Sequence, residues 1–90
     1  MKRLECKIKG VVVGVTFREF AERRARLLKL VGFVENNQAG GVTVVAEGDQ
    51  EKLQDFLRHL WRGPVGAKVE DIAANWSETK GEFRWFEIRY

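Results

Sequence analysis

The order of two kinds of hydrophobic periodicity constrains the fold of this 90-residue chain more than any other feature. Apolar residues alternate with charged ones over Leu4–Ile8, a pattern typical of a half-buried strand. Apolar residues at helical spacing follow over Phe17–Leu28, and again over Leu53–Leu60. Short β-rich runs lie between and after these segments, so strands and helices are expected to alternate in a defined order.

The β-rich runs complete that order. Phe33–Asn36 and Val42–Ala46 flank a Gly/Asn turn at residues 37–41 and predict a hairpin. Ala67–Ile72 begins a further strand, and Phe83–Tyr90 predicts a last one. The sequence therefore predicts β-α-β-β-α-β plus an extra C-terminal strand. This is a ferredoxin-like α+β sandwich, with an antiparallel sheet and two helices on one face. Many functions use such a fold, so the fold alone does not identify one.

Capping residues predict where the helices begin and end. Thr16 and Glu19 have the spacing of a capping box, and Asp49 is the expected N-cap of the second helix. We expect Gly32 to end the first helix and Gly63-Pro64 to end the second.

Length and cysteine content favour one small domain without disulfides. A chain of 90 residues can build one modest core, so we expect residues 1–90 to form a single domain. Cys6 is the only cysteine, which excludes an internal disulfide and favours a cytoplasmic location. The N-terminal segment has no apolar stretch of signal-peptide length, and no segment approaches a membrane span. We expect a cytoplasmic monomer with no membrane contact.

The charge pattern argues against a nucleic-acid partner. The net charge is +3, from 16 basic and 13 acidic residues, and the basic residues of the two helical segments are expected to form a solvated surface. RNA-binding domains of this fold present aromatic residues to the bases, whereas Gly41–Ala46 contains none. A mild positive charge instead suits the attraction of a small phosphorylated anion.

The junction Gly10–Arg18, between the first strand and the first helix, is the most informative segment. Gly10 and Gly14 allow backbone conformations in which successive amides converge, as in a phosphate-binding nest. The helix N-terminus adds free N–H groups and partial positive charge. Arg18 in the first turn opposes the helix dipole, and a bound dianion would reverse that penalty. From spacing alone, a plain turn with an exposed Arg18 is an equally good interpretation.

Two segments resemble the signatures of the acylphosphatases. Gly10–Arg18 reads GVVVGVTFR and is similar to the first signature, written G-x-V-Q-G-V-x-[F/Y]-R. Gly32–Asn36, with Gly40, Val42 and Gly48 after it, resembles the second, an aromatic-x-x-Asn strand that leads into a Gly turn. The similarity spans nearly all of the chain.

The resemblance implies an acylphosphatase, which hydrolyses the carboxyl–phosphate bond of a small-molecule acyl phosphate to a carboxylate and inorganic phosphate. It implies that a phosphate-binding loop holds the phosphoryl group, formed by Val13, Gly14, Val15, Thr16, Phe17 and Arg18. Arg18 matches the family's catalytic arginine, which binds the phosphate, and Asn36 matches its catalytic asparagine, which positions the attacking water. The family uses no metal or other cofactor. His59 is the only histidine, so no histidine-based metal site can be assembled.

Two residues depart from the family pattern. Val13 stands where the family usually has Gln, although its backbone N–H is still available. Glu35 stands where a basic or neutral residue is usual, and alternation along a strand directs it away from Asn36. We therefore expect a working enzyme with reduced or altered substrate affinity. The alternative is a non-catalytic domain of the same fold that binds phosphate or carbamoyl phosphate, or a regulatory module.

Overall fold

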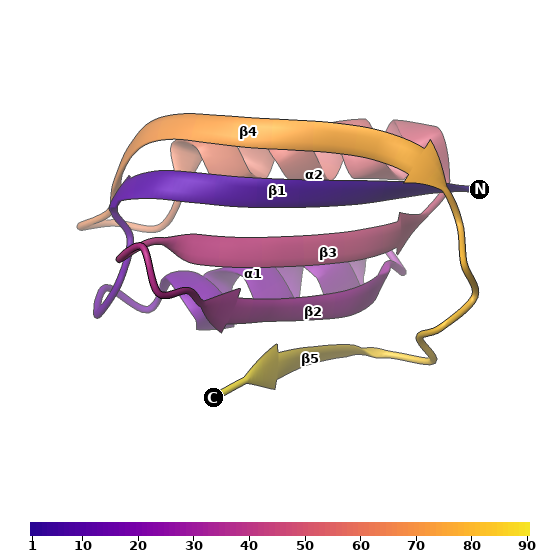
Figure 1. Ribbon diagram of the computed structural model, residues 1–90, viewed down its shortest axis with the longest axis horizontal. Helices are drawn as coiled ribbons and strands as arrows, with labels where there is room; N and C mark the ends of the chain where they lie inside the picture. Colours follow the sequence, from indigo (N-terminus) through magenta and orange to yellow (C-terminus); the bar gives the residue numbers. More distant parts are fainter.

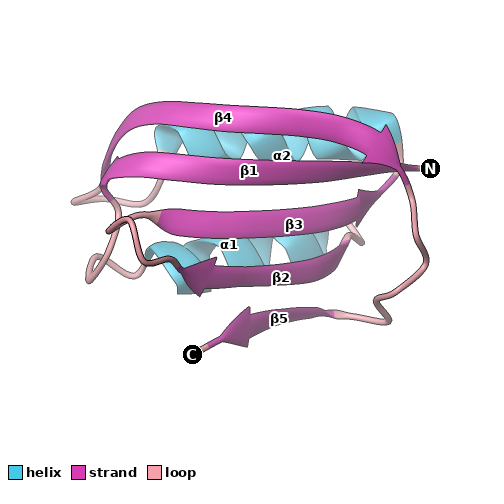
Figure 2. Cartoon of the chain, in the orientation of Figure 1, coloured by secondary structure: helices cyan, strands magenta, loops and turns pink.

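The computed structural model describes residues 1–90, in which two helices cover one face of a five-stranded sheet (Figures 1 and 2). The strands are β1 (Lys2–Val11), β2 (Val31–Asn36), β3 (Val42–Gly48), β4 (Lys68–Glu78) and β5 (Phe86–Arg89). The helices are α1 (Phe17–Leu27) and α2 (Gln50–Arg62). The strands lie side by side in the order β4-β1-β3-β2-β5. The predicted β-α-β-β-α-β order with an extra C-terminal strand is confirmed.

The sheet is mixed, because the extra strand pairs differently from the other four. β1 pairs antiparallel with β3 and β4, and β2 pairs antiparallel with β3. β5 lies parallel to β2, with Gly32 opposite Phe86 and Glu35 opposite Arg89. The parallel pairing follows from the crossover of residues 79–85, which carries the chain from β4 around to the far edge of the sheet (Figure 1). The ends of β2 and β5 therefore lie at the same end of the molecule.

The hydrophobic core lies between the helices and the sheet. Alternate residues of β1 face the helices, which contribute the fully buried side chains of Phe17, Ala21, Ala25, Leu53, Phe56 and Leu60. Phe86 joins β5 to this core, since its ring packs edge-to-face on Phe56 with the centroids 6.0 Å apart. Neither helix has the length and apolar character needed to cross a membrane.

Two local predictions at the ends of α1 are wrong. Thr16 precedes the helix, but its side chain makes no capping hydrogen bond, so the predicted capping box with Glu19 does not form. Its backbone is left-handed, with φ of 60°, and its hydroxyl donates to the preceding carbonyl at 2.6 Å. Gly32 does not end α1, which stops at Leu27. Gly32 lies inside β2, where a Cβ would be 1.9 Å from the carbonyl oxygen of Val45.

A buried ion pair on the face of the sheet opposite the helices binds the first residues of the crossover. Glu47 is 3% exposed and accepts a hydrogen bond from Arg3, with Nη1 2.9 Å from Oε2. The Thr79 hydroxyl also donates to this carboxylate, as do the amides of Lys80 at 3.0 Å and Gly81 at 3.2 Å. Burial by itself would raise the pKa of Glu47, but these donors outweigh burial and lower the pKa to about 2. The carboxylate therefore holds the start of the crossover against β3.

Candidate active site

The junction between β1 and α1 forms a curled loop at the end of the sheet where β2 also ends (Figure 1). The β1–β4 pairing shifts register at Lys9/Gly10, and Val12 then turns into the core with 1% exposure. Gly14 and Thr16 both have left-handed backbones, with φ of 78° and 60°. Left-handed residues next to ordinary ones make successive amides converge, which forms a concave site for an anion. Because a β-branched residue rarely adopts this φ, Thr16 marks local strain of the kind found at binding sites.

The two glycines of the loop serve different purposes. Gly10 has φ of 132°, and a Cβ there would lie 2.1 Å from the carbonyl oxygen of Lys68 on β4. Gly10 therefore permits the close approach of β1 and β4 where the loop begins. A Cβ on Gly14 would meet nothing within 4 Å, so this position needs glycine only for its positive φ.

A hollow of about 240 Å³ lies between this loop, the first turn of α1 and the end of β2. Its lining residues are Val12, Gly14, Thr16, Phe17, Arg18, Glu19 and Asn36. The structure thus brings Arg18 and Asn36, which are far apart in the sequence, to the same hollow. Val13 and Val15 from the predicted loop do not line it: Val13 is 45% exposed, and Val15 packs against the core. The hollow is therefore not filled by the valine that departs from the family pattern.

Val12 and Glu19 are the two lining residues that were not among the predicted site residues, and Glu19 had been assigned to helix capping instead. It is half-buried and forms no ion pair. Its position directly after Arg18, in the first turn of the helix, could have indicated that it lies near the hollow. Glu35, in contrast, does not line the hollow, in agreement with the strand alternation.

Arg18 is held by the C-terminal end of the chain rather than by a carboxylate. Its guanidinium lies over the ring of Tyr90, with Cζ 4.7 Å from the ring centroid, and Nη1 donates to the carbonyl of Arg89 at 3.5 Å. Arg18 takes part in none of the ion pairs of the protein. The aromatic ring orients the side chain without neutralising it, so its charge is available to an anion. Only the aromatic character of the last strand could have indicated this contact from the sequence.

Asn36 is the last residue of β2 and is exposed at the hollow. Its carboxamide takes part in none of the side-chain hydrogen bonds of the protein. Both its carbonyl oxygen and its amide group are therefore free to bind a ligand or water.

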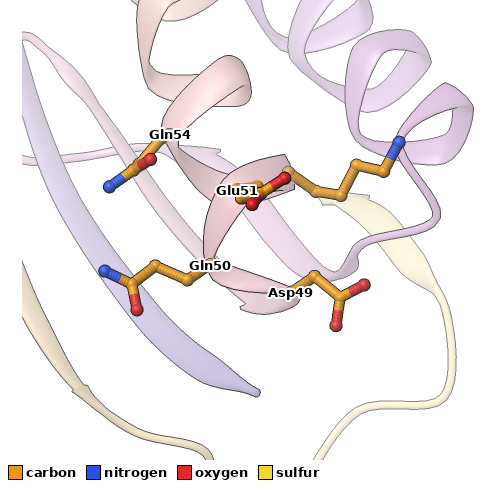
Figure 3. A pocket seen from close by; sticks show the side chains of 5 residues that line it. Asp49, Gln50, Glu51 and Gln54 are labelled. Carbon is orange, nitrogen blue, oxygen red and sulfur yellow. The ribbon is translucent and has the colours of Figure 1, made fainter.

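A larger hollow, of about 580 Å³, lies at the N-terminus of α2 (Figure 3). Its lining is entirely polar and consists of Asp49, Gln50, Glu51, Lys52 and Gln54. The labelled side chains in Figure 3 point in different directions rather than toward a common centre. Two carboxylates and one ammonium do not favour an anion, and this hollow has no curled loop or arginine. No group of three or more His, Cys, Asp or Glu side chains is arranged to hold a metal ion.

The fold and the loop define a ferredoxin-like α/β protein with a curled glycine loop between its first strand and first helix. The family model described as Acylphosphatase matches residues 4–88. An acylphosphatase of Thermus thermophilus is 47% identical over 81 residues, which cover 90% of this chain and 92% of the relative. One from Dehalococcoides mccartyi is 41% identical over 91 aligned positions, with full coverage of both. The crystal structure of acylphosphatase from Bacillus subtilis, 34% identical, matches with a TM-score of 0.96 over the whole of both chains.

The chain belongs to the acylphosphatase family. It is therefore a hydrolase acting on acid anhydrides, and the family acts on small-molecule acyl phosphates. This confirms the class of activity predicted from the two signatures, and it favours the enzyme over the non-catalytic alternative.

Proposed function

We propose that this chain cleaves the carboxyl–phosphate bond of an acyl phosphate in the hollow between β1, α1 and β2. In this proposal Arg18 and the loop amides of residues 13–18 hold the phosphoryl group, and Asn36 directs the attacking water. The observation that carries the proposal is the common hollow lined by Arg18, Asn36 and the left-handed Gly14 and Thr16.

The uncapped start of α1 supports phosphate binding. The first amides of a helix have no partner inside the helix, and a capping side chain normally accepts from one of them. Thr16 does not cap α1, because its hydroxyl donates to the Val15 carbonyl instead. The first amides of α1 are therefore left for an anion, and the helix dipole adds to the attraction.

The side chains of the hollow fit a reaction that needs positioning and charge stabilisation rather than a metal. The Arg18 guanidinium can contact two phosphate oxygens at once, and it offsets the negative charge that develops on them. The side-chain carbonyl oxygen of Asn36 accepts a hydrogen bond from the water. This bond directs the water oxygen toward phosphorus. The water oxygen forms a bond to phosphorus as the bond to the carboxylate oxygen breaks, and the two protons of the water stay on the phosphate product, from which one can pass to solvent. The carboxylate leaves with its electron pair and needs little protonation, so no strong general acid is required.

The size of the hollow supports a broad range of acyl groups. Its volume of about 240 Å³ is below the roughly 300–1,000 Å³ of pockets that enclose whole ligands. It therefore suits the phosphoryl group, and the acyl group projects past the rim. All the proposed site residues come from one chain, so we propose that residues 1–90 act as a single-domain monomer. A cytoplasmic location is proposed from the single free, buried thiol of Cys6.

Hydrolysis of benzoyl phosphate, with inorganic phosphate as the competing ligand, tests this proposal. Asn36→Ala is expected to lower kcat by about a hundredfold and to leave the inhibition constant for phosphate nearly unchanged. Arg18→Ala is expected to damage both quantities. Arg23→Ala is the matched control, because Arg23 is exposed on the same helix and forms no ion pair or side-chain hydrogen bond. A wild-type protein that binds phosphate but does not hydrolyse benzoyl phosphate would show a binding domain instead.

A further inference from the structure

Asn37 organises the turn that follows Asn36. Its Oδ1 accepts hydrogen bonds from the amides of Ala39 and Gly41, both at 3.0 Å. Its Nδ2 donates to Oγ1 of Thr43 on β3 at 3.1 Å. Its main chain adds two more bonds, from its amide to the Gly41 carbonyl at 2.9 Å and to its carbonyl from Gly40 at 3.3 Å. Asn37 alone therefore connects the residues of the β2–β3 turn with one another and with the first part of β3.

The β2–β3 turn also packs against β1. A Cβ on Gly41 would lie 2.2 Å from the carbonyl oxygen of Ile8, so the turn packs directly on the last part of β1. The same strand leads into the curled loop at Gly10. The turn and the curled loop therefore both adjoin the same strand, β1.

The carboxamide of Asn36 depends on this arrangement because no side-chain hydrogen bond orients it. Its carboxamide has no hydrogen-bond partner within the protein, so its direction is set by its backbone and its neighbours. The backbone of Asn36 pairs with Val42 on β3, and Asn37 follows it directly as the first residue of the turn. Any relaxation of the turn would shift the carboxamide relative to Arg18.

We infer that Asn37 is a positioning residue for the hydrolytic reaction: its side chain fixes the turn so that the Asn36 carboxamide faces the hollow. This inference rests on the proposed role of Asn36. Asn37 itself does not line the hollow and has no direct role in phosphate binding. Its loss should therefore affect the aim of the water and leave the phosphate contacts of the loop intact.

The test is a comparison of kcat for benzoyl phosphate with the inhibition constant for inorganic phosphate. Asn37→Ala is expected to lower kcat about tenfold, because small misplacements of a catalytic group are costly. The phosphate inhibition constant should stay within about twofold of wild type, because residues 13–18 are untouched. Asn37→Ser keeps an oxygen that can accept from the turn amides and should recover much of the rate. Gln38→Ala is the matched control, since Gln38 is exposed in the same turn and makes no side-chain hydrogen bond.

Thr43→Val provides a second test that leaves the main-chain contacts of the turn in place. It removes only the acceptor for Asn37 Nδ2 and should lower kcat about threefold without a change in phosphate affinity. If Asn37→Ala is folded and its kcat equals that of Gln38→Ala, the inference is wrong. It is also wrong if Asn37→Ala weakens phosphate binding as much as turnover, or if Asn37→Ala fails to fold and Thr43→Val keeps the full rate. An inactive wild type, or an active Asn36→Ala, would instead overturn the proposed function on which the inference rests.

Discussion

Replacing Glu47 by Gln should remove a pH-dependent part of the folding free energy. The pKa of this carboxyl is about 2 in the folded protein, against an ordinary value of 4.5. The folded state therefore binds fewer protons at Glu47 than the unfolded chain does between these two values. The stability that results is fully present above pH 4.5 and is lost as the pH falls toward 2.

The size of the effect follows from the two pKa values. Their difference corresponds to about 3 kcal/mol of stabilisation at neutral pH. About 2 kcal/mol of this should be lost by pH 3, and about 3 kcal/mol by pH 2. Little solvent screening is expected, because Glu47 is 3% exposed and accepts from Arg3, Thr79 and two amides.

Urea unfolding of wild type and Glu47→Gln between pH 7 and pH 2.5 measures this contribution. The difference in unfolding free energy between the two proteins should shrink by about 2 kcal/mol from pH 6 to pH 3. Glu70→Gln is the control, because Glu70 is exposed and forms no ion pair, and its difference from wild type should stay small. A wild-type to Glu47→Gln difference that is constant over this range would show that Glu47 contributes no pH-dependent stability.

Three further outcomes are expected. Cys6 is 1% exposed and burial raises its pKa to about 12, so a thiol reagent should label it only after denaturation; rapid labelling of the folded protein would contradict this. Gly10→Ala should cost about 2 kcal/mol of unfolding free energy, because of its positive φ and the Lys68 carbonyl; an unchanged denaturation midpoint would be the opposite result. Tyr90→Ala should raise KM for benzoyl phosphate about fivefold, because Arg18 loses the ring beneath it; a KM equal to that of wild type would show that the stacking does not matter.

Hydrophobic periodicity was sufficient to predict the order of elements, because burial on one face of each strand and helix dominates their formation. It failed where longer-range contacts decide. Gly32 was predicted to end the first helix, but it lies in β2. Glycine is needed there because β2 and β3 approach so closely that a Cβ would clash with the Val45 carbonyl oxygen. The parallel placement of β5 depends on the crossover held by Glu47, and the contacts of Glu47 with residues 79–81 join distant parts of the chain.

The residues proposed for the site were predictable to the extent that local motifs define them. Arg18 and Asn36 were identified through the resemblance of two segments, and the topology then places both at one hollow. Thr16 occupies the N-cap position of α1, but its side chain does not make the predicted capping hydrogen bond, because a residue that caps and one that leaves the amides free look alike in sequence. Tyr90 and Asn37 were missed for another reason. Their contacts with Arg18 and with the β2–β3 turn are made by side chains whose direction a sequence pattern does not specify.

A titration of the isotope-labelled protein with inorganic phosphate, followed by the NMR shifts of the backbone amides, shows directly which amides bind the phosphoryl group. We predict that the largest shifts fall on residues 13–18, and that they disappear in Arg18→Ala. Shifts concentrated on the other helix start, at Gln50, Glu51 and Lys52, with residues 13–18 unmoved, would contradict it.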